Sequence, residues 1–429
     1  MGCSSSNAVL PESAIKRTYS EVEFKEDFFD HYLLETKLGQ GNFAQVRLLS
    51  RVSQDDSPCD EPVKLREVCA KILDLRDKRK PGRACPGLQD LAAMEADIAK
   101  RVGHHPNCVD FYGAYIHSGI CFMTMEKCDC SLYEYMREHP ALNERSLGKT
   151  IFAMVSGLHH LHSLRVVHRD IKPDNFMVGG VDRQTVKICD FGLSAILPEH
   201  GMLCGPVGTT PFMCPEMFIG HWYNEKADIW SLGVTVYVFL YGQFPYEAKN
   251  GTSEEMAKAI IKGNPPSFEP AASPTANKFV QVLLQRVSEH RPGAEEILNL
   301  PYLVSVMTSR HMKNTTLPSL EQNLNTARRK GAVRTRDLSK RTELDEVLSA
   351  MQLKSGGVKL PLSWKSRHQA PMVQSLSDSS KDLAQRSISL STISEDSTRS
   401  DLSPEQSQCA DSSVNTVLTQ CHTKSSMSL

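Results

Sequence analysis

The chain has 429 residues, of which 40% are hydrophobic, enough for one large domain of about 270 residues with extensions. Its formal net charge of −1 provides no overall attraction to nucleic acid or to a membrane surface. The 13 cysteines show no paired spacing, and the sequence contains neither a secretory signal nor an apolar run near the roughly 20 residues of a membrane span. We therefore expect free thiols in a reducing cytosol.

The first residues of the chain, Met1–Ser6, match the signal for N-myristoylation. Gly2 is the acceptor after removal of the first Met, Ser6 supplies the favoured hydroxyl, and Cys3 is a neighbouring palmitoylation candidate. One acyl chain binds a membrane only marginally, whereas two anchor a protein stably. Dual acylation at Gly2 and Cys3 therefore predicts location at the cytoplasmic face of a membrane and in the cytoplasm. The alternative is a polar N-terminus in which Gly2 has no such role.

Four segments between residues 38 and 128 show regular patterns. Residues 38–46 predict a strand, a glycine turn and a second strand, and residues 68–72 predict an apolar strand with a single Lys. Helix-forming residues with helical spacing occupy 91–98. A further strand, 120–125, runs into residues 126–128.

A dense group of charged side chains follows in residues 168–175, His-Arg-Asp-Ile-Lys-Pro-Asp-Asn, and Asp190-Phe191-Gly192 begins fifteen residues after Asn175. Phosphoryl transfer needs these residue types, because the departing group carries dispersed negative charge. An Asp takes the substrate proton, a Lys neutralises oxygen charge, and an Asn and an Asp hold Mg²⁺. In these two motifs the chain resembles the eukaryotic protein kinases.

The resemblance implies an α+β, bilobal fold. The smaller lobe would be a five-stranded antiparallel sheet with the Glu95 helix in front, and the larger lobe mostly helical. It also implies ATP and Mg²⁺ as cofactors and proteins as substrates. The expected division is a lipidated segment at 1–31, a kinase domain at 32–303, a basic regulatory linker at 304–370 and a Ser/Thr-rich disordered tail at 371–429.

The same resemblance implies a nucleotide site between the lobes. Lys71 would grip the α- and β-phosphates with Glu95 as its anionic partner. Val46 and Ala70 would lie above the adenine ring and Met177 below it, and Met125 would be the gatekeeper before the hinge. The other residues implied to contact the nucleotide are Leu38, Gly39, Gln40, Gly41, Asn42, Phe43, Ala44, Glu126, Cys128 and Asp190.

The implied catalytic residues centre on Asp170, the base. Thr209 would bridge Asp170 and Lys172, the arrangement of serine/threonine kinases, and Asn175 with Asp190 would hold the metal. A pseudokinase or a membrane-tethered scaffold that acts by protein binding is the alternative, although the presence of all these residues argues against it.

Two structural anchors complete the resemblance. Residues 208–216 match the loop that forms the substrate pocket, with Cys214 in place of the usual Ala, and Asp228 begins a segment predicted to be a buried helix. Glu216 is expected to pair with Arg291.

The loop 193–207 nearly lacks a phosphate acceptor. We therefore expect it to be ordered without phosphorylation, with the carboxylate of Glu199 facing Arg169, and we place control in the segment after residue 303. Residues 324–336 form a basic stretch that resembles the autoregulatory segments of calcium/calmodulin-dependent kinases, which implies membership of that group and calmodulin or another regulator as a partner at 320–340. A solvated basic linker is the alternative.

Overall fold

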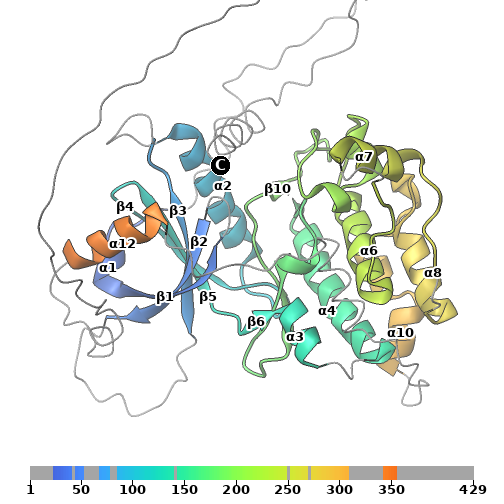
Figure 1. The fold of residues 1–429 in the computed structure, drawn as a ribbon, viewed down its shortest axis with the longest axis horizontal. Coiled ribbons are helices and arrows are strands. Elements are labelled where there is room, and N and C mark those ends of the chain that lie inside the picture. Colours follow the sequence, from blue (N-terminus) through green and yellow to red (C-terminus); the bar gives the residue numbers. More distant parts are fainter. Residues whose placement is uncertain are drawn as a thin grey trace, which may run out of the picture.

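The computed structural model describes residues 23–40, 44–52, 67–77, 85–139, 143–248, 252–268, 272–308 and 342–354. They form a smaller lobe built on a sheet and a larger, mostly helical lobe (Figure 1). The predicted bilobal α+β fold is confirmed. No helix in these ranges is both long enough and apolar enough to cross a membrane.

The smaller lobe is built on a five-stranded antiparallel sheet in the order β1-β2-β3-β5-β4. Its strands are β1 (Tyr32–Gln40), β2 (Ala44–Arg51), β3 (Val68–Asp74), β4 (Phe111–His117) and β5 (Ile120–Glu126). Because side chains alternate along a strand, the sheet has two apolar faces. Helix α2 (Pro86–Val102) packs on one face through Ala92 and Ala96, and we call this the inner face.

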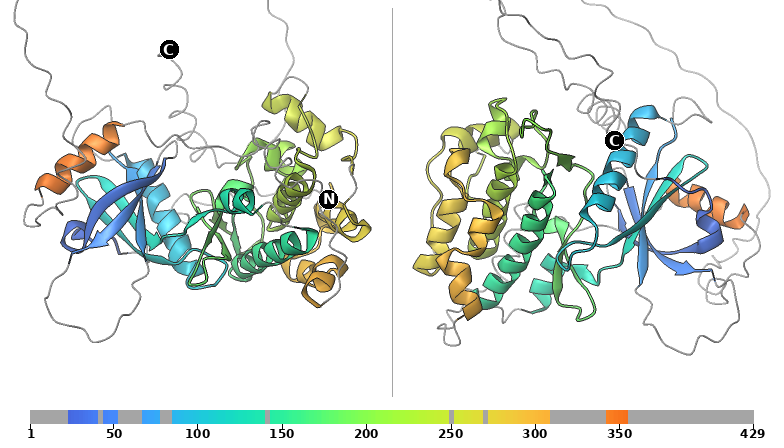
Figure 2. Two further views of the ribbon diagram at one scale, coloured as in Figure 1. Left: turned by 60° about the horizontal axis from the view of Figure 1, so that its bottom comes forward. Right: turned by 180° about the vertical axis from the view of Figure 1, so that it is seen from behind.

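The opposite, outer face carries two helices far apart in the sequence. These are the short α1 (Phe28–His31) and α12 (Glu343–Lys354), which lie over the sheet in all ribbon views (Figure 2). Phe28 stacks on Phe122 of β5 at a ring distance of 4.0 Å, and Leu348 of α12 is buried in the same cluster. Helix α12 falls inside the segment 304–370, for which the sequence predicts a basic regulatory linker.

The larger lobe surrounds one apolar core. Its helices are α3 (Leu132–Glu138), α4 (Glu144–Ser163), α5 (Pro215–Phe218), α6 (Lys226–Tyr241), α7 (Ser253–Lys262), α8 (Pro274–Leu283), α9 (Ala294–Leu298) and α10 (Pro301–Thr308), with 3₁₀ turns at 173–175, 210–212 and 288–290. Short strands border the cleft: β6 (Cys130–Ser131), β8 (Phe176–Gly179) and β9 (Thr185–Ile188) form one sheet, and β7 (Val166–Val167) pairs with β10 (Ala195–Ile196).

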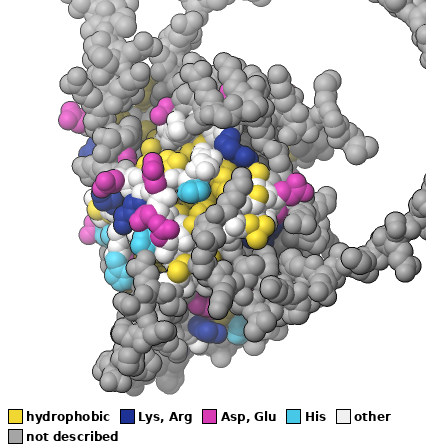
Figure 3. All heavy atoms as spheres, turned by 90° about the vertical axis from the view of Figure 1, so that its left-hand side faces the viewer, with side chains coloured by type: hydrophobic (Ala, Val, Ile, Leu, Met, Phe, Trp, Pro, Cys, Tyr) yellow, Lys and Arg dark blue, Asp and Glu magenta, His cyan; other side chains and the backbone are white. Residues whose placement is uncertain are grey.

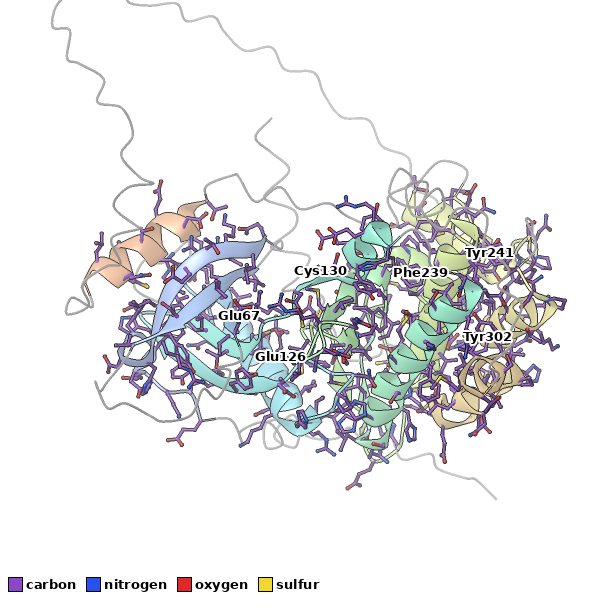
Figure 4. The ribbon with its side chains drawn as sticks, turned by 90° about the horizontal axis from the view of Figure 1, so that it is seen from below. Glu67, Glu126, Cys130, Phe239, Tyr241 and Tyr302 are labelled. Carbon is purple, nitrogen blue, oxygen red and sulfur yellow. The ribbon has the colours of Figure 1, made fainter. Side chains whose placement is uncertain are left out.

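Helix α6 is the centre of this lobe. Its sequence is apolar all round, as expected for a helix surrounded by other elements, and nearly all of its residues are buried. Gly233 permits close approach of α8, because a Cβ there would lie 2.9 Å from the Leu283 side chain. Phe239 and Tyr241 of α6 and Tyr302 of α10 lie inside the lobe, whereas Glu126 lies at the junction of the lobes (Figure 4).

Candidate active site

A three-member ion network spans the two lobes at the cleft. The Nζ atom of Lys71, on β3, lies 2.5 Å from Glu95 Oε1 on α2 and 2.7 Å from Asp190 Oδ1 in the larger lobe. Burial opposes the charge of Lys71, but the two carboxylates outweigh it and raise its pKa, and Lys71 in turn lowers the pKa of Asp190. Both groups are therefore charged at neutral pH, as their predicted roles of phosphate-binding cation and metal ligand require.

The Asp170 carboxylate is held by three neighbours. Lys172 Nζ donates to its Oδ2 at 2.6 Å, and the Thr209 hydroxyl donates to its Oδ1 at 2.7 Å. Lys172 also donates to Thr209 Oγ1 at 2.8 Å, which closes the bridge between the three residues. Asn175 Nδ2 donates to Asp170 Oδ2 at 3.1 Å and to the Asp170 backbone carbonyl at 2.8 Å. This network fixes the direction in which Asp170 presents its oxygens.

The buried carboxylate of Asp228 fixes the backbone conformation of the catalytic loop. Asp228 accepts the backbone N–H groups of His168 and Arg169, both at 2.8 Å, and a His162 ring nitrogen lies 3.0 Å away. The loop needs this support because Arg169 adopts a positive φ of 65°, a strained conformation for a non-glycine residue. The sequence pattern predicts that Asp228 begins a buried helix, but it does not predict this contact with the loop. An Asp in the first turn of a mostly apolar helix was the available signal.

Glycine is required where the substrate-pocket loop passes the catalytic loop. Gly208 has a φ of 120°, and a Cβ at this position would lie 2.3 Å from the carbonyl oxygen of Arg169. Any other residue would push the neighbouring Thr209 away from Asp170.

The two proposed metal ligands lie in adjacent backbone segments. The Cys189 N–H, which precedes Asp190, donates to the Asn175 carbonyl at 3.0 Å. Among the described residues there is no group of three or more His, Cys, Asp or Glu side chains arranged to hold a metal. One carboxylate and one amide oxygen fit Mg²⁺, which keeps several waters and takes further oxygen ligands from substrate phosphates.

The adenine-facing residues need one correction. Ala70 lies on the outer face of the sheet, fully buried in the cluster that contains Phe28 and Leu348, so it does not lie above the cleft. Cys69 points the other way, toward the hinge, where its Sγ lies 3.6 Å from the Glu126 carbonyl. Counting two residues back from Lys71, which faces the cleft, would have identified Cys69 from the sequence.

The remaining predicted contacts follow the strands that border the cleft. Val46 pairs with Lys71 across β2 and β3 and so shares its face, and Met177 projects from β8 on the side away from the buried Phe176. Leu38, Gly39 and Gln40 end β1, and Ala44 begins β2. Gly41, Asn42 and Phe43 lie outside the described residues.

The hinge follows β5. Met125 ends the inner-face row of that strand, and the next side chain, Glu126, is buried against Lys187, with Oε2 and Nζ 2.9 Å apart. The Glu126 side chain thus forms a structural ion pair. Only the backbone of Glu126 is left for the predicted contact with the nucleotide. Burial raises the pKa of Cys69 to about 12 and also raises that of Cys128, so both thiols beside the hinge are neutral at physiological pH.

Arg169 does not face Glu199, which corrects the expectation for the loop 193–207. Its guanidinium donates to the backbone carbonyls of Leu193 at 2.6 Å and Ser194 at 3.4 Å, and its Nη1 lies 3.5 Å from the Tyr223 hydroxyl. The loop is held by backbone pairing as well, because Ala195 pairs with Val167. Neutral oxygens therefore satisfy the Arg169 side chain in the part of the chain that the structure describes.

Comparison with known proteins agrees with this geometry. Residues 32–303 match the model of the protein kinase domain. The chain is 35% identical to MAP kinase kinase mkk-4 of Caenorhabditis elegans over 220 residues, 48% of this chain and 60% of the relative. It is 35% identical to the Aurora kinase of Schizosaccharomyces pombe over 244 residues, 56% and 66% of the two chains.

A third similar protein is mitogen-activated protein kinase kinase 2 of Arabidopsis thaliana, 32% identical over 207 residues, which are 46% of this chain and 56% of the relative. The chain thus spans between half and two thirds of the length of these relatives. Because the kinase-domain model covers residues 32–303, well over half of the sequence, the chain belongs to the protein kinase family.

Proposed function

We propose that the chain is an ATP- and Mg²⁺-dependent serine/threonine kinase that phosphorylates proteins. The observation that carries this proposal is the closed network of Asp170, Lys172 and Thr209, with all three pairs in hydrogen-bond contact. A carboxylate held in this way is placed to orient a substrate hydroxyl and to accept its proton.

The chain's own groups would divide the remaining work. The ammonium group of Lys71, fixed by Glu95, would bind phosphate oxygens, and Lys172 would neutralise charge that develops on the transferred group. Asn175 and Asp190 would hold Mg²⁺, which shields the phosphate charge when bound.

A peptide-library assay tests this function. Phosphatase-treated full-length protein should transfer the γ-phosphate of ATP to Ser or Thr peptides without an upstream kinase, because Arg169 already has its partners in the loop. Phosphoamino-acid analysis should detect phosphoserine or phosphothreonine. ATP and peptide left unchanged would instead support the alternative of a pseudokinase scaffold.

The same assay tests the proposed regulation. The basic stretch at 320–340, which lies outside the described residues, motivates the proposal that calmodulin or a similar regulator binds there and that the chain belongs to the calcium/calmodulin-dependent group. Activity should then change on addition of calcium and calmodulin together and stay constant with either alone. An unchanged rate and no binding to calmodulin beads would contradict this part of the proposal.

We also propose that Gly2 and Cys3 are acylated and anchor the kinase to a membrane, on the basis of the N-terminal signal. In eukaryotic cells, Gly2→Ala should move the protein to the soluble fraction, whereas Cys3→Ser should leave a weaker association through one chain. Ser5→Ala is the matched control and should stay with the membrane. Wild-type protein that is soluble and carries no acyl mass would disprove the anchor.

A further inference from the structure

A helix from beyond the kinase domain forms part of the small lobe. Leu348 of α12 is fully buried in the outer-face cluster with Phe28 and Leu34, and Leu344 and Met351 pack beside it. Figure 3 views the molecule from the side on which α12 lies, where charged and hydrophobic side chains lie next to one another at the surface. The backbone N–H of Leu34 also donates to the side chain of Gln352, at 3.2 Å. Helix α12 is therefore attached to β1 by both apolar and polar contacts.

One carboxylate of α12 joins the two strands of the glycine-rich hairpin. Asp345 Oδ2 accepts from Lys37 Nζ of β1 at 2.8 Å. Its Oδ1 accepts from Gln45 Nε2 at 2.8 Å and from Arg47 Nη2 at 3.0 Å, both on β2. The Asp345 side chain is only 6% exposed, so these ionic contacts are shielded from water and salt.

These contacts lie close to the glycine turn. Gln40 and Gln45 form the last strand pair before residues 41–43, and Gln45 Nε2 also donates to Gln40 Oε1 at 3.2 Å. Val46 faces the cleft, whereas its neighbours Gln45 and Arg47 face α12. Asp345 thus holds the hairpin from the side opposite the nucleotide position, and α12 itself does not enter the cleft.

We propose that Asp345 is a positioning residue that holds the glycine-rich hairpin in the position needed to bind ATP. The C-terminal segment then promotes nucleotide binding through α12. Loss of the Asp345 carboxylate removes its contacts with Lys37, Gln45 and Arg47 and with them the bridge between β1 and β2. The inference rests on the kinase function proposed above, because its effect is on the affinity for ATP.

The test compares Asp345→Asn with Glu346→Gln in the full-length chain. Glu346 is the next residue of the same helix and is exposed. Its substitution by Gln removes the same charge. For Asp345→Asn we expect the KM for ATP to rise at least about fivefold, the lower end of typical coupling between separate sites. The KM for the peptide and kcat at saturating ATP should stay within about twofold of wild type, which separates ATP positioning from a general loss of folded enzyme. Glu346→Gln should match wild type in every constant.

A second variant removes the same contact by a change in the sheet. Lys37→Met should raise the KM for ATP in the same way, and the double variant with Asp345→Asn should add little, because both changes remove one interaction. Hydrogen exchange in residues 36–50 should be faster in Asp345→Asn than in Glu346→Gln, a readout independent of catalysis.

The outcomes separate the rival roles. An unchanged KM for ATP with unchanged exchange overturns the proposal. A higher kcat in Asp345→Asn would make α12 an inhibitory element, and a lower melting temperature with a constant KM would make it structural only, so either result rejects the positioning role. Wild-type protein without any phosphoryl transfer would refute the proposed function, whereas the exchange measurement would still decide whether Asp345 orders the hairpin.

Discussion

Asp170→Asn is expected to lower kcat by roughly 10²- to 10⁴-fold, the usual contribution of a positioned general base. The amide keeps the shape of the side chain but loses its charge, so Lys172 no longer has an anion at 2.6 Å and the substrate hydroxyl has no proton acceptor. Steady-state peptide phosphorylation measures the loss, and the melting temperature should change little because the backbone contacts of Asp228 with the loop remain.

Asp190→Asn and Lys71→Met should be similarly inactive, since they remove a metal ligand and the phosphate-binding cation. Asp182→Asn is the matched control: Asp182 is exposed and accepts backbone N–H groups in the turn between β8 and β9, a position that Asn tolerates. Substantial activity in Asp190→Asn with a normal magnesium dependence would show that the site has been wrongly assigned.

Arg291→Ala is expected to destabilise the larger lobe by about 3–5 kcal/mol, because it leaves the Glu216 carboxylate buried without its partner. The Arg291 side chain is fully buried, and its two terminal nitrogens donate to Glu216 at 2.6 and 2.7 Å. It also donates to three backbone carbonyls and lies over the Trp230 ring. In a thermal melt this corresponds to a decrease of roughly 5–15 °C.

The control for this prediction is Arg183→Ala. The Arg183 side chain is 76% exposed and its nitrogen lies 3.8 Å from Asp129, so we expect no measurable change. The double variant of Glu216→Ala and Arg291→Ala should lose less stability than the sum of the single variants. Equal melting temperatures for Arg291→Ala and Arg183→Ala would mean that the buried pair does not stabilise the lobe.

The catalytic loop was predictable because its residues are close in the sequence and serve one reaction. Asp170, Lys172 and Asn175 lie within six residues, and their chemistry fixes their types. Strand alternation was also sufficient to place Cys69 rather than Ala70 toward the cleft. The prediction that Ala70 lies above the adenine ring was wrong because this alternation was not applied from Lys71. The Glu199 prediction was wrong for another reason: backbone carbonyls can satisfy a guanidinium, and no sequence pattern records where a carbonyl points.

The sequence by itself determined the two-lobed fold and the residue types of the two side-chain networks, Lys71–Glu95–Asp190 and Asp170–Lys172–Thr209, because each motif encodes a local element and a required residue type. Only the tertiary structure showed that α12 packs on β1 and β2. Asp345 lies 308 residues from Lys37, and its partners Gln45 and Arg47 are ordinary surface residues of a strand in sequence terms. A contact between such distant segments depends on the shape and charge of a completed sheet face, which a one-dimensional pattern does not contain.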